Sequence, residues 1–268
     1  MKAKKVYFSI IPILLLVFLL GSCQKPLQPE GEIKNDFNVK KFISDKLLST
    51  NKIDFIGTMS ASSHFWGPKS ANSDVLHYLY KCRINQAVNS PNTFVNVAAV
   101  KVADYDIATP DSLGIYYASS VPTGNVKRFG KNTRWKIGAN STYNIPAFDT
   151  TMYVPKELIV QNYSVKRYIS RSTDFTINWN QDANNNRDMY IVLTEDTDNV
   201  GQNIFFWSNE IPDNGSFTIS KTVFSNMSVG ASFKLVLIRG NGMIVEKNGK
   251  NFLLLGYSYI SQSFVLNQ

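Results

Sequence analysis

Cysteine and histidine are scarce in this sequence, which holds two residues of each among its 268. His64, His77 and Cys82 are too few and too scattered for a recognisable zinc site. No Gly-x-Ser-x-Gly elbow and no glycine-rich phosphate loop occurs, so neither serine hydrolysis nor phosphate chemistry is indicated. We therefore expect no enzymatic activity and no cofactor, although an unrecognised site around either histidine stays open.

Long runs of positive charge are also missing. The formal net charge is +8, but Lys2, Lys4 and Lys5 lie in the first five residues. The remaining chain carries 25 basic and 20 acidic side chains, a net charge of +5. Beyond residue 5, no run of lysine or arginine exceeds two residues. A moderate, scattered positive balance is typical of a solvated surface, so we expect no nucleic-acid partner.

The strongest motif lies at the start of the chain. Basic residues precede an apolar stretch over residues 6–20, which has the length of a signal peptide. A membrane-spanning helix needs about 20 apolar residues, so this stretch is too short to favour one. The sequence Leu20-Gly21-Ser22-Cys23 follows and resembles the bacterial lipobox. The resemblance implies cleavage after residue 22 and attachment of two or three acyl chains to Cys23, hence a lipid anchor in a membrane.

The residue after the lipidated cysteine bears on the membrane that is reached. In enterobacterial lipoproteins an aspartate there favours retention in the inner membrane, and this chain has Gln24 instead. The resemblance therefore implies the outer membrane, with the periplasmic and surface faces both open. With Cys23 lipidated, Cys82 has no partner, and its apolar surroundings over residues 75–84 predict that it is buried as a small hydrophobe.

The mature chain is predicted to have three parts. Residues 23–36 contain two prolines and a glycine and are expected to form an extended tether. Residues 37–157 form a β-rich part that opens with a short amphipathic helix at 37–48. It is predicted to include a strand over 75–85, a buried strand over 94–102 and a hairpin in which 126–129 pairs with 133–138 across Gly130-Lys131-Asn132.

Residues 158–268 show the clearest strand pattern. The segment 175–179 alternates strictly between apolar and polar residues, and 189–193 is uniformly apolar. A turn is expected at Arg239-Gly240-Asn241-Gly242, between a strand over 233–238 and a strand at 244–245. About seven strands at roughly 10–15-residue spacing predict an antiparallel β-sandwich. The fold class is therefore all-β.

A family resemblance rests on four stretches of this part: Asp174–Asn180, Asn184–Asn186, Tyr190–Leu193 and Asn214–Ile219. They resemble the immunoglobulin-like or fibronectin-III-like domains of Bacteroidota lipoproteins, over roughly the C-terminal third of the chain. Trp179 is similar to the core tryptophan of these sandwiches. Without a second cysteine nearby, the antibody-type disulfide is absent. The resemblance implies an immunoglobulin-like fold and no particular activity.

Oxygen-bearing side chains alternate in one predicted loop, at Asp182, Asn184, Asn186 and Asp188. Alternate oxygen donors are typical of a calcium loop. However, an EF-hand would have glycine and glutamate where this chain has Arg187 and Leu193, and asparagine and aspartate are also the usual residues of a hairpin tip. Calcium binding is a hypothesis beside that plainer interpretation.

Aromatic residues make up 13% of the chain. Trp66, Trp135 and Trp207 are candidates for stacking against a sugar ring, and core packing is the alternative. We predict a non-enzymatic binding or adhesion module of the cell envelope, with a glycan as the candidate ligand. The alternative is a structural or accessory subunit of a larger envelope complex, with protein partners.

Overall fold

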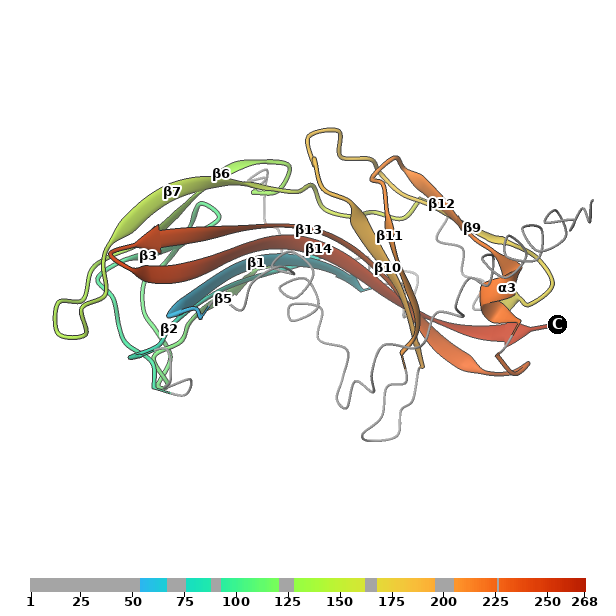
Figure 1. Ribbon diagram of the computed structural model, residues 1–268, viewed down its shortest axis with the longest axis horizontal. Coiled ribbons are helices and arrows are strands. Elements are labelled where there is room, and N and C mark those ends of the chain that lie inside the picture. The colour runs from blue at the N-terminus through green and yellow to red at the C-terminus, as the bar shows by residue number, and fades with distance from the viewer. Residues whose placement is uncertain are drawn as a thin grey trace, which may run out of the picture. The chain divides into compact units, whose positions relative to one another are not determined.

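The computed structural model describes residues 54–66, 76–87, 93–120, 128–161, 168–195, 205–225 and 227–268. Strands are the main regular structure of these residues, and the helix α3 (Lys221–Phe224) is a single turn (Figure 1). The all-β prediction is confirmed. The predicted leader, the Cys23 lipidation site, the tether and the helix at 37–48 lie outside the described residues.

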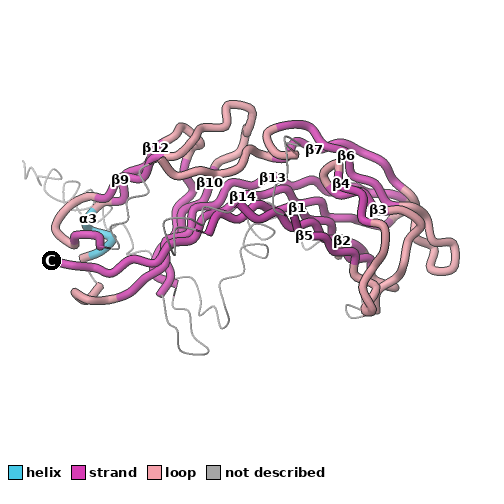
Figure 2. Tube along the Cα trace, turned by 180° about the vertical axis from the view of Figure 1, so that it is seen from behind, coloured by secondary structure: helices cyan, strands magenta, loops and turns pink. Residues whose placement is uncertain are grey.

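The largest sheet, here the main sheet, has eight strands in the order β11-β10-β13-β14-β1-β2-β5, with β8 paired to β14. Figure 2 shows β1, β2 and β5 side by side with the β13–β14 pair. The strands are β1 (Gly57–Trp66), β2 (Leu76–Ile84), β5 (Tyr116–Ser120), β8 (Tyr168–Ser170), β10 (Met189–Glu195), β11 (Phe205–Ile211), β13 (Ser232–Lys247) and β14 (Lys250–Asn267).

Two smaller sheets pack against one face of the main sheet, which we call its inner face. The outer sheet has four strands in the order β4-β3-β6-β7, and the short sheet pairs β12 with β9. Their bounds are β3 (Val100–Val102), β4 (Tyr105–Ile107), β6 (Lys131–Ile137), β7 (Phe148–Val154), β9 (Phe175–Asn178) and β12 (Ser216–Ile219).

The inner face of the main sheet supports two hydrophobic cores. One core joins β1, β2 and the first part of β14 to the outer sheet, with Trp135 and Phe252 fully buried. The other joins β10, β13 and the last part of β14 to the short sheet and α3, with Trp179 and Phe233 buried. A third cluster, which includes Leu255, lies on the opposite face. Close packing leaves no room for a Cβ at Gly256 without displacing Val154, 3.0 Å away.

The long hairpin of β13 and β14 is the centre of the main sheet, and it corrects the turn predicted at Arg239-Gly240-Asn241-Gly242. Those residues are extended inside β13, where Gly240 and Gly242 lie opposite the bulky Tyr257 and Leu255. The chain turns instead at Asn248-Gly249, where both residues have positive φ. An Asn-Gly pair is the preferred two-residue hairpin turn because it adopts positive φ at both positions.

Two predictions for the N-terminal half are wrong. Lys131 and Asn132 do not form a turn, because they begin β6, and β6 pairs with β7 rather than with residues before Gly130. The stretch 94–102 is not one buried strand. Only Val100–Val102 belongs to a strand, and Asn96, Ala98 and Ala99 are exposed. Val95 and Val97 are buried in the core although the chain around them is not a strand.

Other strand predictions are confirmed. The strand expected at 75–85 is β2, and Cys82 within it is fully buried. The alternation at 175–179 is β9, whose Ile177 points into the core while Thr176 is exposed. The apolar run at 189–193 forms the first five residues of β10, and its side chains are buried on both faces of the sheet.

The predicted ranges 37–157 and 158–268 share the main sheet. Most strand pairs are antiparallel, but β14 also pairs in parallel with β1, with Gly57 opposite Phe252. The C-terminal hairpin therefore supplies strands to both cores. The described residues beyond Gly31 belong to one compact unit. That the two ranges are separate domains stays a prediction.

A buried ion pair lies between the two cores on the inner face. The Arg239 guanidinium and the Asp213 carboxylate are 0% and 3% exposed, and two parallel hydrogen bonds of 2.8 Å join them. Arg239 also donates to the backbone carbonyls of Asn180 and Lys156, and the Trp179 indole donates to Asp213 over 3.0 Å. Three separate segments, at Lys156, Trp179–Asn180 and Asp213, are thus tied to one arginine of β13.

We predict that Arg239→Met lowers the free energy of unfolding by about 3–5 kcal/mol, because it leaves the Asp213 carboxylate buried without its cation. Urea-induced unfolding followed by tryptophan fluorescence measures the change. Arg134→Met is the matched control: Arg134 pairs with Asp149 on the exposed surface, so we expect little change. Equal effects of the two substitutions would contradict the assigned role of the buried pair.

Candidate functional site

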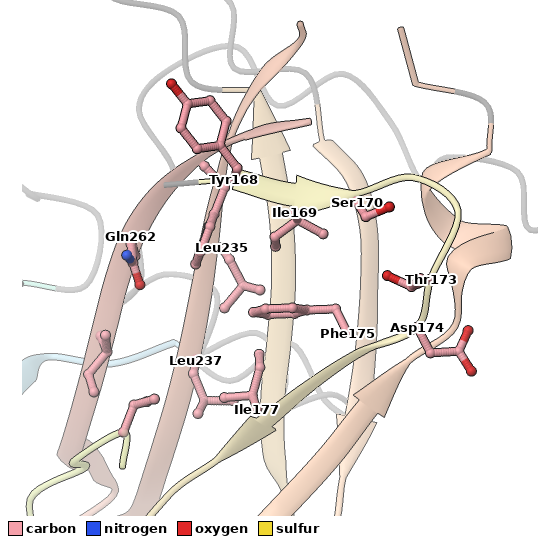
Figure 3. A pocket seen from close by; sticks show the side chains of 13 residues that line it. Tyr168, Ile169, Ser170, Thr173, Asp174, Phe175, Ile177, Leu235, Leu237 and Gln262 are labelled. Carbon is pink, nitrogen blue, oxygen red and sulfur yellow. The ribbon is translucent and has the colours of Figure 1, made fainter. Parts of the chain in front are cut away.

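An apolar cleft opens between β8, β9 and the β13–β14 hairpin (Figure 3). Its volume is about 270 Å³. Phe175 projects into it, and aliphatic side chains surround that ring. The apolar lining residues are Val160, Ile169, Phe175, Ile177, Leu235, Leu237, Ile260 and Phe264.

Two polar side chains at the rim of the cleft, Ser170 and Asp174, make hydrogen bonds within the protein. The Asp174 carboxylate accepts a hydrogen bond from the backbone N–H of Lys221, and the Ser170 hydroxyl donates to the carbonyl of Gln268. Tyr168 is 62% exposed at the mouth. The apolar floor of this cleft is suited to an apolar group of matching shape.

A second, polar hollow lies on the outer sheet and the loops next to it. We call it the amide-lined hollow, because four of its seven lining residues are asparagines. The lining residues come from four segments, namely the start of β6, the end of β7, the loop over 182–188 and the middle of β13. The lining residues are Gly130, Lys131, Asn132, Tyr153, Asn184, Asn186 and Asn241.

Asp182 positions the tyrosine of this hollow. The Tyr153 hydroxyl donates to both oxygens of the buried Asp182 carboxylate, over 2.8 and 3.0 Å. The same carboxylate accepts from the backbone N–H groups of Lys156 and Asn184. Burial, followed by the hydrogen bond to Asp182, raises the pKa of Tyr153 above its ordinary value, so this phenol stays neutral. Its half-buried ring is held in one orientation.

The asparagines of the hollow fall into two groups. The Asn241 side chain accepts from the Arg187 guanidinium over 3.1 Å and donates to the Tyr153 carbonyl over 3.0 Å, so it holds the site together. Asn132 and Asn186 are exposed, and their amides make no hydrogen bond to the residues that the structure describes. An amide offers both donors and an acceptor to a ligand.

The four predicted calcium ligands have different positions. Asp182 is buried and binds Tyr153 and the backbone, while Asn184 and Asn186 line the amide-lined hollow. Asp188 is exposed. Within the described ranges, no group of three or more histidine, cysteine or acidic side chains lies close enough to hold a metal ion. Calcium binding stays a prediction.

Two of the three predicted stacking tryptophans, Trp135 and Trp207, lie in different cores. Trp135 is fully buried in the core, and its indole donates to the Thr133 hydroxyl over 3.0 Å. Trp207 is half-buried against Phe217, with 6.4 Å between ring centroids. The side chain of Trp66 lies outside the described part of the chain. The aromatic ring that does line a polar site, Tyr153, was missed because nothing in its local sequence distinguishes it from a core residue.

The two histidines, which are scattered in the sequence, are neighbours in the fold. Strands β1 and β2 place His64 directly opposite His77 in the register, and the His64 ring stacks on Tyr259 with centroids 4.0 Å apart. Such cross-strand partners depend on pairing over a turn that lies outside the described residues, so spacing alone does not reveal them.

Neither a protein-family model nor a curated protein sequence matches this chain. Among the residues that the structure describes, no helix has the length and apolar character needed to cross a membrane.

We predict that Asp182→Ala lowers the free energy of unfolding by about 1–3 kcal/mol, because the Tyr153 hydroxyl and the Lys156 N–H lose their acceptor. Urea-induced unfolding checks this value. Asp188→Ala, from the same loop but exposed, is the control and should change little. A rise of Tm with calcium that Asp188→Ala abolishes would instead support the predicted calcium loop.

Proposed function

We propose that this protein is a lipid-anchored binding module of the bacterial cell envelope, without catalytic activity, whose ligand is a glycan held in the amide-lined hollow. The convergence of amide and phenol groups from four segments on one open site supports this proposal. Sugar hydroxyls both donate and accept hydrogen bonds, and asparagine side chains do the same. A fixed tyrosine ring offers a flat apolar face to the C–H groups of a sugar.

The Tyr153–Asp182 contact makes the hollow a prearranged site. A ring that is already oriented loses little conformational freedom when a ligand binds, so more of the interaction free energy appears as affinity. Lys131 is the one charged residue of the lining, and its ammonium lies 3.3 Å from Asp104, which partly neutralises it. The hollow therefore suits a neutral or weakly acidic sugar.

The proposed location in the cell follows from the N-terminal motif. Cleavage before Cys23 and lipidation of its thiol would place the folded body beside a membrane, most simply the outer membrane because Gln24 follows the cysteine. Each buried methylene contributes about 0.8 kcal/mol, so two or three acyl chains give durable anchoring. Residues 23–36 would then act as the spacer between the membrane and the sheets.

The finer fold assignment is part of the same proposal: the C-terminal part is an immunoglobulin-like sandwich. Trp179 is 2% exposed within the core between the main sheet and the short sheet, the environment expected for the core tryptophan of such domains. The antiparallel pairs β10–β11, β10–β13 and β9–β12 also agree with it.

A second candidate function is that of an accessory subunit in a larger envelope complex. The apolar cleft favours it, because about 270 Å³ lined by aliphatic and aromatic residues can accept a hydrophobic side chain of a partner. Co-purification of a stoichiometric partner after mild detergent extraction, with no glycan bound by the pure protein, would favour this candidate over the first.

We predict that Asn132→Ala combined with Asn186→Ala weakens glycan binding about tenfold or more, because two hydrogen bonds to the ligand are lost. A glycan array identifies the ligand, and isothermal titration calorimetry measures its Kd. The double substitution Asn96→Ala and Asn209→Ala removes two exposed amides elsewhere and should leave Kd unchanged. The proposal fails if the wild-type protein binds no glycan, or if the two double variants bind equally.

We predict that Cys23→Ala abolishes incorporation of radiolabelled palmitate and releases the protein from the membrane fraction, because the acceptor thiol is gone. The matched control is Cys82→Ala, which removes the other cysteine. That side chain is buried in the core, so labelling and fractionation should persist. Labelled Cys23→Ala protein in the membrane fraction would contradict lipidation at this position.

A further inference from the structure

Two cations share one face of β2. Lys81 and Arg83 are two residues apart, and residues at this spacing point to the same side of a strand, about 7 Å from each other. This is the opposite face of the main sheet, away from the core that contains Cys82. Both side chains are half-buried, so water screens their repulsion less than it would on an exposed surface.

Neither cation has a carboxylate partner among the described residues. The Arg83 guanidinium lies over the ring of Phe94, 5.5 Å from its centroid, and the buried Nε has no hydrogen-bond acceptor. By contrast, Lys101, Lys131 and Arg134 of the outer sheet are each paired with an aspartate. The buried Nε of Arg83 is thus a donor that the fold itself leaves unused.

The pKa of Lys81 also reflects an excess of positive charge on this face of β2. Burial, followed by the positive charge of Arg83, lowers the pKa of Lys81 below its ordinary value. Asp111 acts in the other direction and more weakly. One of its carboxylate oxygens already accepts from the backbone N–H groups of Leu113 and Ile115. A bound anion would neutralise the positive charge that Asp111 leaves.

Residues with hydroxyl groups flank the two cations in the sheet. In the sheet register, Ser60 of β1 and Tyr117 of β5 are the two neighbours of Lys81, and Thr58 of β1 is the neighbour of Arg83. Tyr117 is 52% exposed, so the site is reached from solvent at the β5 edge of the sheet. Hydroxyls donate to anionic oxygens, as guanidinium and ammonium groups do.

We propose that Lys81 and Arg83, together with the hydroxyls of Ser60 and Tyr117, bind a phosphate group. Phosphate carries up to two negative charges and several acceptor oxygens, which match two cations and flanking donors; a carboxylate has one charge and two oxygens. The phosphate group belongs either to a lipid headgroup or to a soluble phosphorylated ligand. This site is on the other face of β2 from the core and does not depend on the amide-lined hollow.

The primary test uses the full-length protein with Cys23→Ala, which cannot be lipidated. It is titrated with inorganic phosphate, and calorimetry measures Kd while thermal unfolding measures Tm. Chloride at the same ionic strength is the control salt. We expect binding with a rise in Tm, because a ligand that binds only the folded state stabilises it. Lys81→Gln with Arg83→Gln should raise Kd at least tenfold and abolish the rise. Lys221→Gln with Lys247→Gln removes two exposed charges and is the matched control, with Kd unchanged.

Arg83→Lys keeps the positive charge and distinguishes binding from misfolding. It should retain a measurable rise of Tm with phosphate even if the double glutamine variant does not fold. The proposal is overturned if phosphate does not bind the parent protein, if the double glutamine variant folds and binds phosphate as tightly as the parent, or if the control variant loses binding equally.

Vesicles separate the two sources of phosphate. Sedimentation of the protein is compared between phosphatidylglycerol vesicles and phosphatidylcholine vesicles. If the protein sediments only with the former, and the double glutamine variant loses this sedimentation, the site binds an anionic lipid headgroup. Binding of inorganic phosphate without vesicle binding assigns it to a soluble phosphorylated ligand. Either result supports the oxyanion site, and glycan binding at the amide-lined hollow should be unchanged in all these variants.

Discussion

The buried contact between Arg239 and Asp213 is the constraint around which this fold is arranged. A guanidinium removed from water is tolerated only when nearly all its donors have acceptors, and here Asp213 and the carbonyls of Asn180 and Lys156 supply them. These acceptors lie on three segments that are distant in sequence. Their convergence on one side chain of β13 sets the path of the chain between the outer sheet and the short sheet.

The amide-lined hollow depends on this arrangement. The loop that contains Asn184 and Asn186 leaves Trp179, whose indole is bound to Asp213, and its Asp182 is anchored in turn to Tyr153 of β7. Asn241, two residues beyond Arg239 on the same side of β13, completes the lining. A polar site built from loops is therefore attached to rigid strands at three points, which is how a binding site keeps its geometry without a ligand.

Local sequence patterns predicted much of the fold and little of the site. Alternation and apolar runs revealed β2, β9 and β10, because burial on one or both faces of a strand leaves a direct trace in the sequence. The turn was misplaced at residues 239–242 because glycines inside a strand, here opposite Tyr257 and Leu255, resemble glycines that turn the chain. The hairpin turn is at Asn248-Gly249. Tyr153, Asn241 and Arg83 owe their roles to register and to contacts across sheets, and such contacts leave no local pattern.

The parallel pairing of β1 with β14 has a consequence for how the protein reaches its native state. The central strands of the main sheet are the last to be synthesised, and Gly57 cannot meet Phe252 until almost the whole chain is available. Contacts between residues so distant in sequence make folding slow, because loop closure must precede them. Neither core can close early, so the chain stays without a finished interior throughout synthesis.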